Sequence, residues 1–253
     1  MAAPVSDEIA LSIVIPMKNE AGNVVSLLEE IADHCADIQH EVIVIDDGST
    51  DETSSLIQGL QQQNPNLRLL QNQTSGGQSA AVHSGVLAAR APIICTLDGD
   101  GQNPPMELPK LFAPLAADKT GKLGLVAGQR VARQDTAAKK LASKVANRLR
   151  AFILKDGTRD TGCGLKGFRR DAFLELPYFN HMHRYLPALF KRDGWKIDLV
   201  DVSHRERGSG RSNYSNLQRA WVGLHDLIGV AWLIKRQKTA RPREITLKTP
   251  QNG

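Results

Sequence analysis

The chain has 253 residues, enough for one large domain or two small ones with a buried core. With 41% hydrophobic and 23% charged residues, its composition excludes a disordered or collagen-like protein. Residues 1–120 carry 5 Lys and Arg against 16 Asp and Glu, whereas residues 121–253 carry 27 against 11. The basic half indicates an anionic partner, although basic runs are more often only solvated surface.

Three widely spaced cysteines, Cys35, Cys95 and Cys163, form no CxxC pair, which argues against a disulfide framework or a zinc site and favours a reducing compartment. The N-terminus lacks the pattern of a secretory signal. No apolar run approaches the ~20 residues of a membrane span. We therefore expect a cytoplasmic protein, peripheral to the membrane at most.

In chain order, short apolar runs alternate with segments of helical periodicity. The expected strands are 11–16, 41–45, 67–70, 93–97 and 123–127, and the expected helices are 21–35, 51–62, 77–89 and 104–117. A capping box of Ser49 and Glu52 is predicted at the start of the second helix. Single helices between strands predict an α/β protein with a mostly parallel twisted sheet and helices on both faces.

Ligands bind beyond the carboxyl ends of the strands in such sheets. Acidic residues follow three of these ends, in the segments 16–20, 46–49 and 98–102. Their mutual repulsion predicts a divalent cation, Mg²⁺ or Mn²⁺, held by hard oxygen ligands. Helix capping is the alternative for Asp47 or Ser49, but it does not explain Asp98, Asp100 and Gln102 together.

Other nucleotide sites have less support. The chain has no P-loop motif and no GxGxxG spacing. The helix start at 75–78 could hold a phosphate, or could be only a tightly packed helix start.

The basic half contains two helical patterns and an arginine-rich loop. Segment 137–155 predicts an amphipathic helix with Phe152 and Ile153 on its apolar side, typical of an anionic interface or of core packing. Segment 217–235 is apolar, contains Trp221 and Trp232 and is followed by basic residues. It predicts either an interfacial helix or a helix packed on the sheet. The loop at 204–214 groups three arginines around two glycines, a composition suited to phosphate.

Seven segments in order carry a resemblance: IPMKNE, VIDDGSTDET, the helix start at 77–85, LDGDGQNPP, GQR at 128–130, RDTGCGLKGFRR and RGSGRSNY. From about residue 11 to 236 the chain resembles the family 2 inverting glycosyltransferases, in the group of dolichyl-phosphate mannose synthase and its bacterial polyprenyl-phosphate relatives. The resemblance implies a GT-A fold over 11–215 after a tail at 1–10. The apolar helix with its tryptophans and basic end predicts a membrane- or partner-docking helix over 216–238, and we expect a flexible tail over 239–253.

The resemblance further implies roles for individual residues. Those expected along the nucleotide are Pro16, Lys18, Glu20, Ile45, Asp47, Leu97 and Gly99. Those expected to hold the metal are Asp98, Asp100 and Gln102. Arg130 and Arg207 are expected to act on substrate phosphates, with Asp98 and Asp100, as the catalytic set. The residues expected at the acceptor phosphate are Arg159, Cys163, Arg211 and Asn213.

Two positions depart from the family pattern. Lys18 stands where an aromatic residue is usual, and Asn213 stands where Lys is usual, so Arg211 is expected to supply the charge there. Cys163 replaces a more frequent Ser and would remain a weak hydrogen-bond donor.

The implied reaction transfers a sugar from GDP-mannose or a UDP-sugar to a polyprenyl phosphate, with inversion. A phosphate nucleophile is already ionised near neutral pH, because its second pKa is about 6, and needs no general base. The implied partners are a nucleotide sugar, a polyprenyl phosphate, and a membrane surface or small membrane subunit. The alternative is a saccharide hydroxyl acceptor with Asp160 as the base. A nucleic-acid-binding module is disfavoured because no reading motif is present, and a non-catalytic scaffold because the metal triple is intact.

Overall fold

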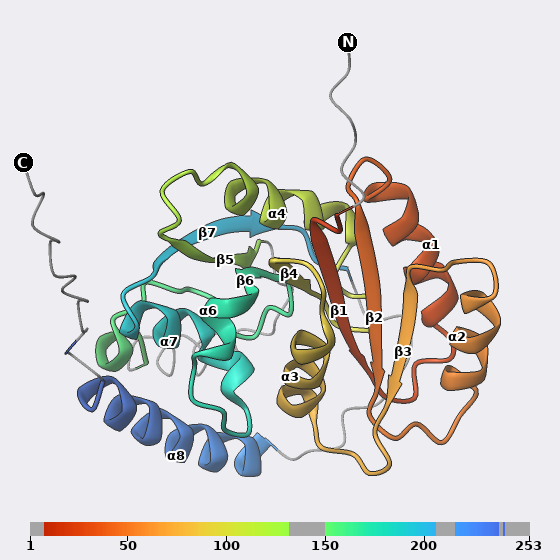
Figure 1. Ribbon diagram of the computed structural model, residues 1–253. Coiled ribbons are helices and arrows are strands. Elements are labelled where there is room, and N and C mark those ends of the chain that lie inside the picture. Colours follow the sequence, from red (N-terminus) through yellow and green to blue (C-terminus); the bar gives the residue numbers. More distant parts are fainter. Residues whose placement is uncertain (1–7, 132–149, 206–215, 238–239, 241–253) are drawn as a thin grey trace, which may run out of the picture.

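The computed structural model describes residues 8–131, 150–205, 216–237 and 240 (Figure 1). Its described strands form one seven-stranded sheet in the order β3-β2-β1-β4-β6-β5-β7. Every neighbouring pair is parallel except the two pairs that include β6. The predicted mostly parallel α/β architecture is therefore confirmed.

The strands are β1 (Leu11–Met17), β2 (His40–Asp46), β3 (Leu67–Gln71), β4 (Ile93–Thr96), β5 (Leu123–Arg130), β6 (Lys166–Arg169) and β7 (Lys196–Val202). The helices are α1 (Val24–His34), α2 (Thr53–Gln61), α3 (Gln78–Ala88), α4 (Leu108–Ala117), α6 (Arg170–Leu174), α7 (Leu186–Arg192) and α8 (Asn216–Lys235). Two short 3₁₀ turns are η1 (Pro105–Glu107) and η2 (Met182–Arg184). All five expected strands and all four expected N-terminal helices are present, with shifted ends.

Helices cover both faces of the sheet (Figure 1). One core cluster joins the sheet to α1, α2 and α4, and a second joins it to α3, α6, α7 and α8. Because both faces are covered, β1 and β2 are almost wholly buried and consist of near-continuous apolar runs.

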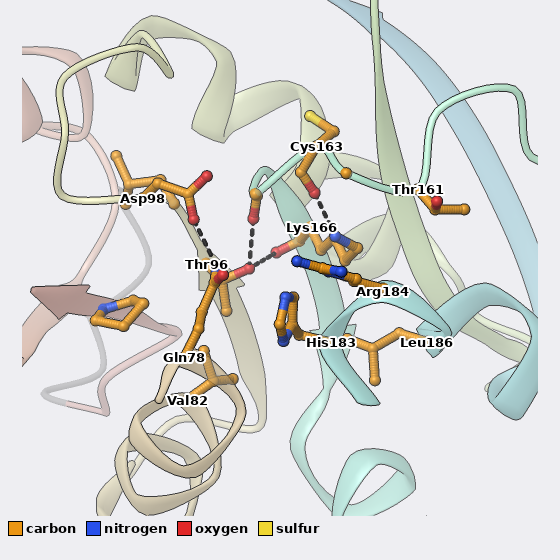
Figure 2. A pocket seen from close by; sticks show the side chains of 14 residues that line it. Gln78, Val82, Thr96, Asp98, Thr161, Cys163, Lys166, His183, Arg184 and Leu186 are labelled. Carbon is orange, nitrogen blue, oxygen red and sulfur yellow. Dashed lines mark hydrogen bonds between the residues drawn. The ribbon is translucent and has the colours of Figure 1, made fainter. Parts of the chain in front are cut away.

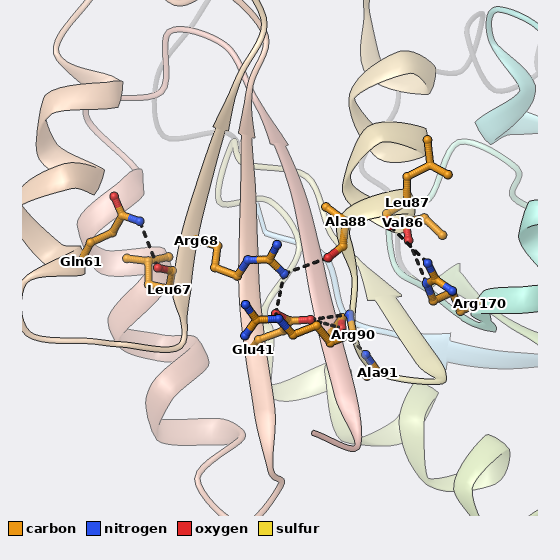
Figure 3. A network of polar contacts seen from close by, with 11 residues as sticks. Glu41, Gln61, Leu67, Arg68, Val86, Leu87, Ala88, Arg90, Ala91 and Arg170 are labelled. Carbon is orange, nitrogen blue, oxygen red and sulfur yellow. Dashed lines mark hydrogen bonds and ion pairs between the residues drawn. The ribbon is translucent and has the colours of Figure 1, made fainter. Parts of the chain in front are cut away.

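Glu41 anchors the end of the sheet opposite the strand carboxyl ends (Figure 3). Its buried carboxylate accepts hydrogen bonds from Ser12 Oγ at 2.7 Å, Arg68 Nη1 at 2.8 Å and the Arg90 backbone N–H at 2.7 Å. The Arg68 guanidinium also donates to the Ala88 carbonyl, which connects β3 to the end of α3. These bonds satisfy a charge inside the sheet that would be costly without partners.

The predicted capping box is wrong. Helix α2 begins at Thr53, and Asp51 rather than Ser49 accepts the Thr53 N–H, at 3.1 Å. The Ser49 hydroxyl instead accepts the backbone N–H of Asn19 at 2.9 Å. The Ser49 side chain therefore bonds to the loop after β1 instead of capping α2 as the local motif predicted.

Helix α8 packs on the α7 side of the molecule through Leu227 and Val230 while other apolar side chains on it remain exposed. Among the described residues, no helix combines the length and the apolar character needed to cross a membrane. Most of the helix expected over 137–155 lies outside the described residues. Its described end, 150–154, is helical, but Phe152 is 77% exposed whereas Arg150 is buried against Asp156, which reverses the expected faces.

Candidate active site

The carboxyl ends of β1, β2 and β4 meet at one edge of the sheet because these strands are parallel neighbours. A cavity of about 300 Å³ opens there, hereafter the strand-end cavity. Its lining residues are Pro16, Met17, Lys18, Glu20, Asp47, Gln78, Ala81, Asp98, Gly99 and Asp100. Seven of the residues expected at the nucleotide or the metal are thus brought together.

Ile45 does not join this set, contrary to the expectation. Its side chain is fully buried in the core under α3, and a Cβ on Gly85 of that helix would lie 2.6 Å from Ile45 Cδ1. Side chains of successive strand residues point to opposite faces, and Ile45 faces the α3 layer. Leu97 is also fully buried and lines a neighbouring cavity instead.

The loop 18–20 on one wall is held in place by the β2–α2 loop. Asn19 adopts the left-handed conformation, with φ of 57°, which Asn tolerates better than most residues. Its side-chain oxygen accepts the Thr50 backbone N–H at 2.8 Å, and Glu20 donates its backbone N–H to Thr53 Oγ1 at 2.9 Å. These bonds fix where Lys18 and Glu20 enter the cavity.

Asp47 serves mainly as a connector within the chain. Its carboxylate accepts hydrogen bonds from four donors on the loop after β3, at 2.7–2.8 Å: Asn72 Nδ2, Ser75 Oγ and the backbone N–H groups of Gly76 and Gly77. Burial alone would raise the pKa of Asp47, but these hydrogen bonds outweigh it and hold the pKa below its usual value. Asp47 therefore positions the start of α3, and both of its oxygens are occupied.

Asp98 lies at the centre of the site, directly after β4. Its Oδ1 accepts from Gln78 Nε2 at 2.6 Å and its Oδ2 from Asn103 Nδ2 at 3.1 Å. Burial raises the pKa of Asp98, and the nearby Asp100 charge raises it further. The backbone of Gly164 packs against the carboxylate so closely that a Cβ there would lie 2.3 Å from Oδ2.

The donor set fits a hard divalent cation. The charge of Asp100 disfavours the ionised form of Asp98, and a bound cation relieves such repulsion. The described ranges contain no group of three His, Cys, Asp or Glu side chains placed to hold a metal. Mg²⁺ is typically bound by one or two carboxylates plus substrate phosphates and waters, so the two carboxylates suffice. Gln102, the third expected ligand, is joined to Arg205, whose backbone N–H donates to its carbonyl at 2.9 Å.

A second cavity of about 330 Å³ adjoins the first, hereafter the lysine cavity after Lys166 (Figure 2). Pro16, Gln78 and Asp98 line both cavities. The other lining residues are Val82, Thr96, Leu97, Thr161, Gly162, Cys163, Gly164, Lys166, His183, Arg184 and Leu186.

Sequence reasoning assigned no role to Gln78, Lys166, His183 or Arg184. The available signals were a lysine that begins a buried strand and a His-Arg pair directly before an apolar helix.

The residues expected at the acceptor phosphate are only partly brought together. Arg159 is exposed and pairs with Asp201 at 2.6 Å. Cys163 lines the lysine cavity, but its side chain is fully buried and packs in the core cluster, and its carbonyl accepts from Lys166 Nζ. Arg207, Arg211 and Asn213 lie outside the described residues.

Arg130 and Asp160 form a two-point ion pair beside these cavities. Arg130 Nε lies 2.5 Å from Asp160 Oδ2 and Nη2 lies 3.0 Å from Oδ1, and the Gly162 backbone N–H also donates to Oδ1 at 3.1 Å. A carboxylate held in this way by a guanidinium is a poor proton acceptor. The geometry therefore weighs against Asp160 as the general base that a hydroxyl acceptor requires.

Comparison with known proteins places this geometry in a family. The family model described as glycosyl transferase family 2 matches residues 12–176. The chain is 32% identical over 238 residues to a dodecaprenyl-phosphate galacturonate synthase of Rhizobium johnstonii, covering 92% of this chain and 69% of that protein. It is also 32% identical over 210 residues to an undecaprenyl-phosphate 4-deoxy-4-formamido-L-arabinose transferase of Photorhabdus laumondii, covering 81% of this chain but only 63% of that one.

Solved structures share the fold. A glucosyl-3-phosphoglycerate synthase from Mycobacterium tuberculosis, in complex with Mn²⁺, UDP and glucosyl-3-phosphoglycerate, superimposes with a TM-score of 0.65 at 19% identity, over 89% of this chain and 79% of that one. A mannosyltransferase from Pyrobaculum calidifontis, in complex with GDP-Man and Mn²⁺, gives 0.62 at 19% identity, over 93% and 66%. These likenesses support the expected GT-A fold. With the family match over more than half of its length, this chain belongs to glycosyl transferase family 2.

Proposed function

We propose that this glycosyltransferase transfers a sugar from a nucleotide sugar to a polyprenyl phosphate, with inversion and with Mg²⁺ or Mn²⁺ at Asp98 and Asp100. The observation that carries the proposal is the strand-end cavity, where Asp98 and Asp100 lie beside Lys18 and Glu20. Two relatives at 32% identity have names that specify dodecaprenyl or undecaprenyl phosphate, which supports the acceptor class.

The residues of the site have separable tasks. Pro16, Lys18 and Glu20 line the place for the nucleotide, and Asp98 and Asp100 would hold the cation against its diphosphate. When bound, such a cation would stabilise the negative charge that develops on the leaving diphosphate. Gln78 and Asn103 orient the Asp98 carboxylate through hydrogen bonds at 2.6 and 3.1 Å.

The acceptor needs little activation by the protein. A phosphate monoester with a second pKa of about 6 is already a dianion near neutral pH. Positioning and charge stabilisation then carry the rate. This agrees with the pairing of Asp160 with Arg130, because Asp160 is the base that a hydroxyl acceptor was expected to use.

The exposed face of α8 is proposed to dock on an anionic lipid surface. Three apolar side chains at helical spacing, Leu224, Ile228 and Trp232, are 44%, 63% and 58% exposed. Together with Ile153 they line an apolar groove of about 280 Å³ that ends at Lys235. Apolar side chains beside a basic helix end are the pattern of a peripheral helix, each nearby Lys or Arg adding about 1 kcal/mol at an anionic surface.

The transfer reaction is tested with labelled nucleotide sugars, undecaprenyl or dolichyl phosphate and Mg²⁺ or Mn²⁺. We expect label in the organic phase for the wild type, its loss in Asp100→Asn and its retention in the control Asp171→Asn, whose side chain is 94% exposed. Label transferred only to a saccharide acceptor overturns the lipid-phosphate acceptor.

Docking is tested separately by sedimentation with vesicles of phosphatidylcholine, with and without phosphatidylglycerol. We expect binding to the anionic vesicles, weakened by salt and by Trp232→Ser, but unchanged in Leu87→Ser, which alters an equally exposed leucine on α3. Equal sedimentation with neutral and anionic vesicles would contradict the proposed contribution of the basic residues to membrane binding.

A further inference from the structure

The lysine cavity has a position that suits the sugar of the donor. It shares Pro16, Gln78 and Asp98 with the strand-end cavity, so a group attached to a diphosphate near Asp98 reaches directly into it. Gln78 stands at the boundary, since it lines both cavities and bonds Asp98. This placement rests on the proposed function, which puts the nucleotide in the strand-end cavity.

The far wall of this cavity is cationic. Lys166 from β6 and Arg184 from η2 both line the cavity (Figure 2), and the charges of both act on His183. Lys166 is buried and donates to the Cys163 carbonyl; among the described residues no other protein group accepts from its ammonium, which carries three protons. Within the described ranges, the Arg184 guanidinium makes no hydrogen bond or ion pair with a protein side chain or carbonyl.

His183 adds a polar but neutral group. Burial lowers its pKa well below the usual value, and the nearby Lys166 and Arg184 charges lower it further. Its Nδ1 lies 2.7 Å from the Ser79 hydroxyl at the start of α3, which fixes the ring against the wall. The described acid that lines the cavity is Asp98, which the proposed function commits to the cation.

Two cations that line one cavity disfavour each other's charge, and an anion bound in that cavity relieves the repulsion. A guanidinium presents a planar fork of donors that matches a carboxylate in a two-point contact. A neutral hexose would leave that fork unpaired, and a site built to bond a group discriminates strongly against an analogue that lacks it.

We propose that the lysine cavity receives the transferred sugar, and that Arg184, assisted by Lys166, selects a donor whose sugar carries a carboxylate. The donor class is then a nucleotide-linked uronic acid. Arg184 is a specificity-determining residue in this assignment, because it contacts the sugar and not the bond that breaks.

The test compares donors that differ only in the carboxylate: UDP-glucuronate with UDP-glucose, and GDP-mannuronate with GDP-mannose. Binding to the whole protein with Mn²⁺ is measured by calorimetry without lipid, so that the readout does not depend on the acceptor. We expect the wild type to bind the uronate of at least one pair about 10-fold or more tightly than its neutral counterpart. Arg184→Gln should remove that preference while changing the affinity for the neutral donor by less than about 2-fold. Arg90→Gln, at an arginine that is 65% exposed at the other end of the sheet, is the matched control and should keep the preference.

The outcomes separate this inference from the proposed function. A uronate preference that depends on Arg184, without transfer to any lipid, supports the inference while the proposed acceptor fails. Transfer to lipid from neutral donors, with no uronate preference, overturns the inference and leaves the proposed function intact. A rise in the KM for the lipid phosphate alone in Arg184→Gln also overturns it, because the guanidinium would then contact the acceptor.

Discussion

Gly164 packs directly against the Asp98 carboxylate, so adding one methyl group at position 164 should have a large effect on the transfer rate. A Cβ at position 164 would lie 2.3 Å from Asp98 Oδ2 and 2.6 Å from Oδ1, whereas ordinary contacts begin at 3.4 Å. The carboxylate or the backbone beside it must therefore move by about 1 Å, the difference between the two values. Gly164 is not among the glycines with positive φ, so alanine brings no backbone strain of that kind.

We expect Gly164→Ala to lower the transfer rate by about 100-fold, because a displacement of about 1 Å in a catalytic site costs that much. Overpacking should cost about 1–3 kcal/mol of folding free energy, which leaves the protein folded. The assay is the initial rate of label transfer, with thermal unfolding and a Mn²⁺ titration on the same sample.

Gly59→Ala in α2 is the matched control, since no atom lies within 4 Å of the added carbon. It should leave the rate unchanged and stabilise the helix by up to about 1 kcal/mol. A Gly164→Ala protein that retains a rate within about 3-fold of wild type, with unchanged Mn²⁺ affinity, would refute the argument that this contact positions Asp98.

Two further predictions concern the framework. Glu41→Gln should destabilise the fold by on the order of 3 kcal/mol in urea unfolding, since it removes the buried charge that pairs with Arg68. Arg90 is largely exposed and lies 4.0 Å from the same carboxylate, so Arg90→Gln should cost less than about 1 kcal/mol. Asp47 has a folded pKa below the unfolded value of about 3.9, so its contribution is complete above that pH and is lost as the pH falls through the folded pKa. Asp47→Asn should therefore destabilise the protein at pH 7 and progressively less below pH 4; an equal loss at pH 7 and pH 3 would contradict the hydrogen-bond explanation.

The fold and one half of the site were predictable from local patterns. Apolar runs separated by single helices indicate parallel strands, and parallel strands bring their carboxyl ends to one edge. That reasoning placed Lys18, Asp47, Asp98 and Asp100 at one edge of the sheet, and all four line the strand-end cavity. It did not reveal that Asp47 is already saturated by four donors from the loop after β3.

The errors have a common origin in contacts between distant segments. Ser49 appeared to cap a helix but bonds Asn19, 30 residues away. The Cys163 side chain packs in the core cluster, where a Cβ on Gly128 would lie 3.1 Å from its sulfur, a contact that the local sequence does not indicate. Local sequence shows which side chains are able to form hydrogen bonds, but not which distant residue lies beside them in the folded protein.

The sequence by itself determined the succession of strands and helices and the acidic edge of the sheet, because both depend on side-chain periodicity and on the residues that follow each strand. Only the tertiary structure decided the lysine cavity. Its walls come from α3, β4, β6 and η2, and β6 inserts between β4 and β5 antiparallel to both. This insertion brings Lys166 close to Asp98, while η2 packs against α3. No local pattern encodes the insertion, since a pairing between distant strands depends on the packing of the whole sheet.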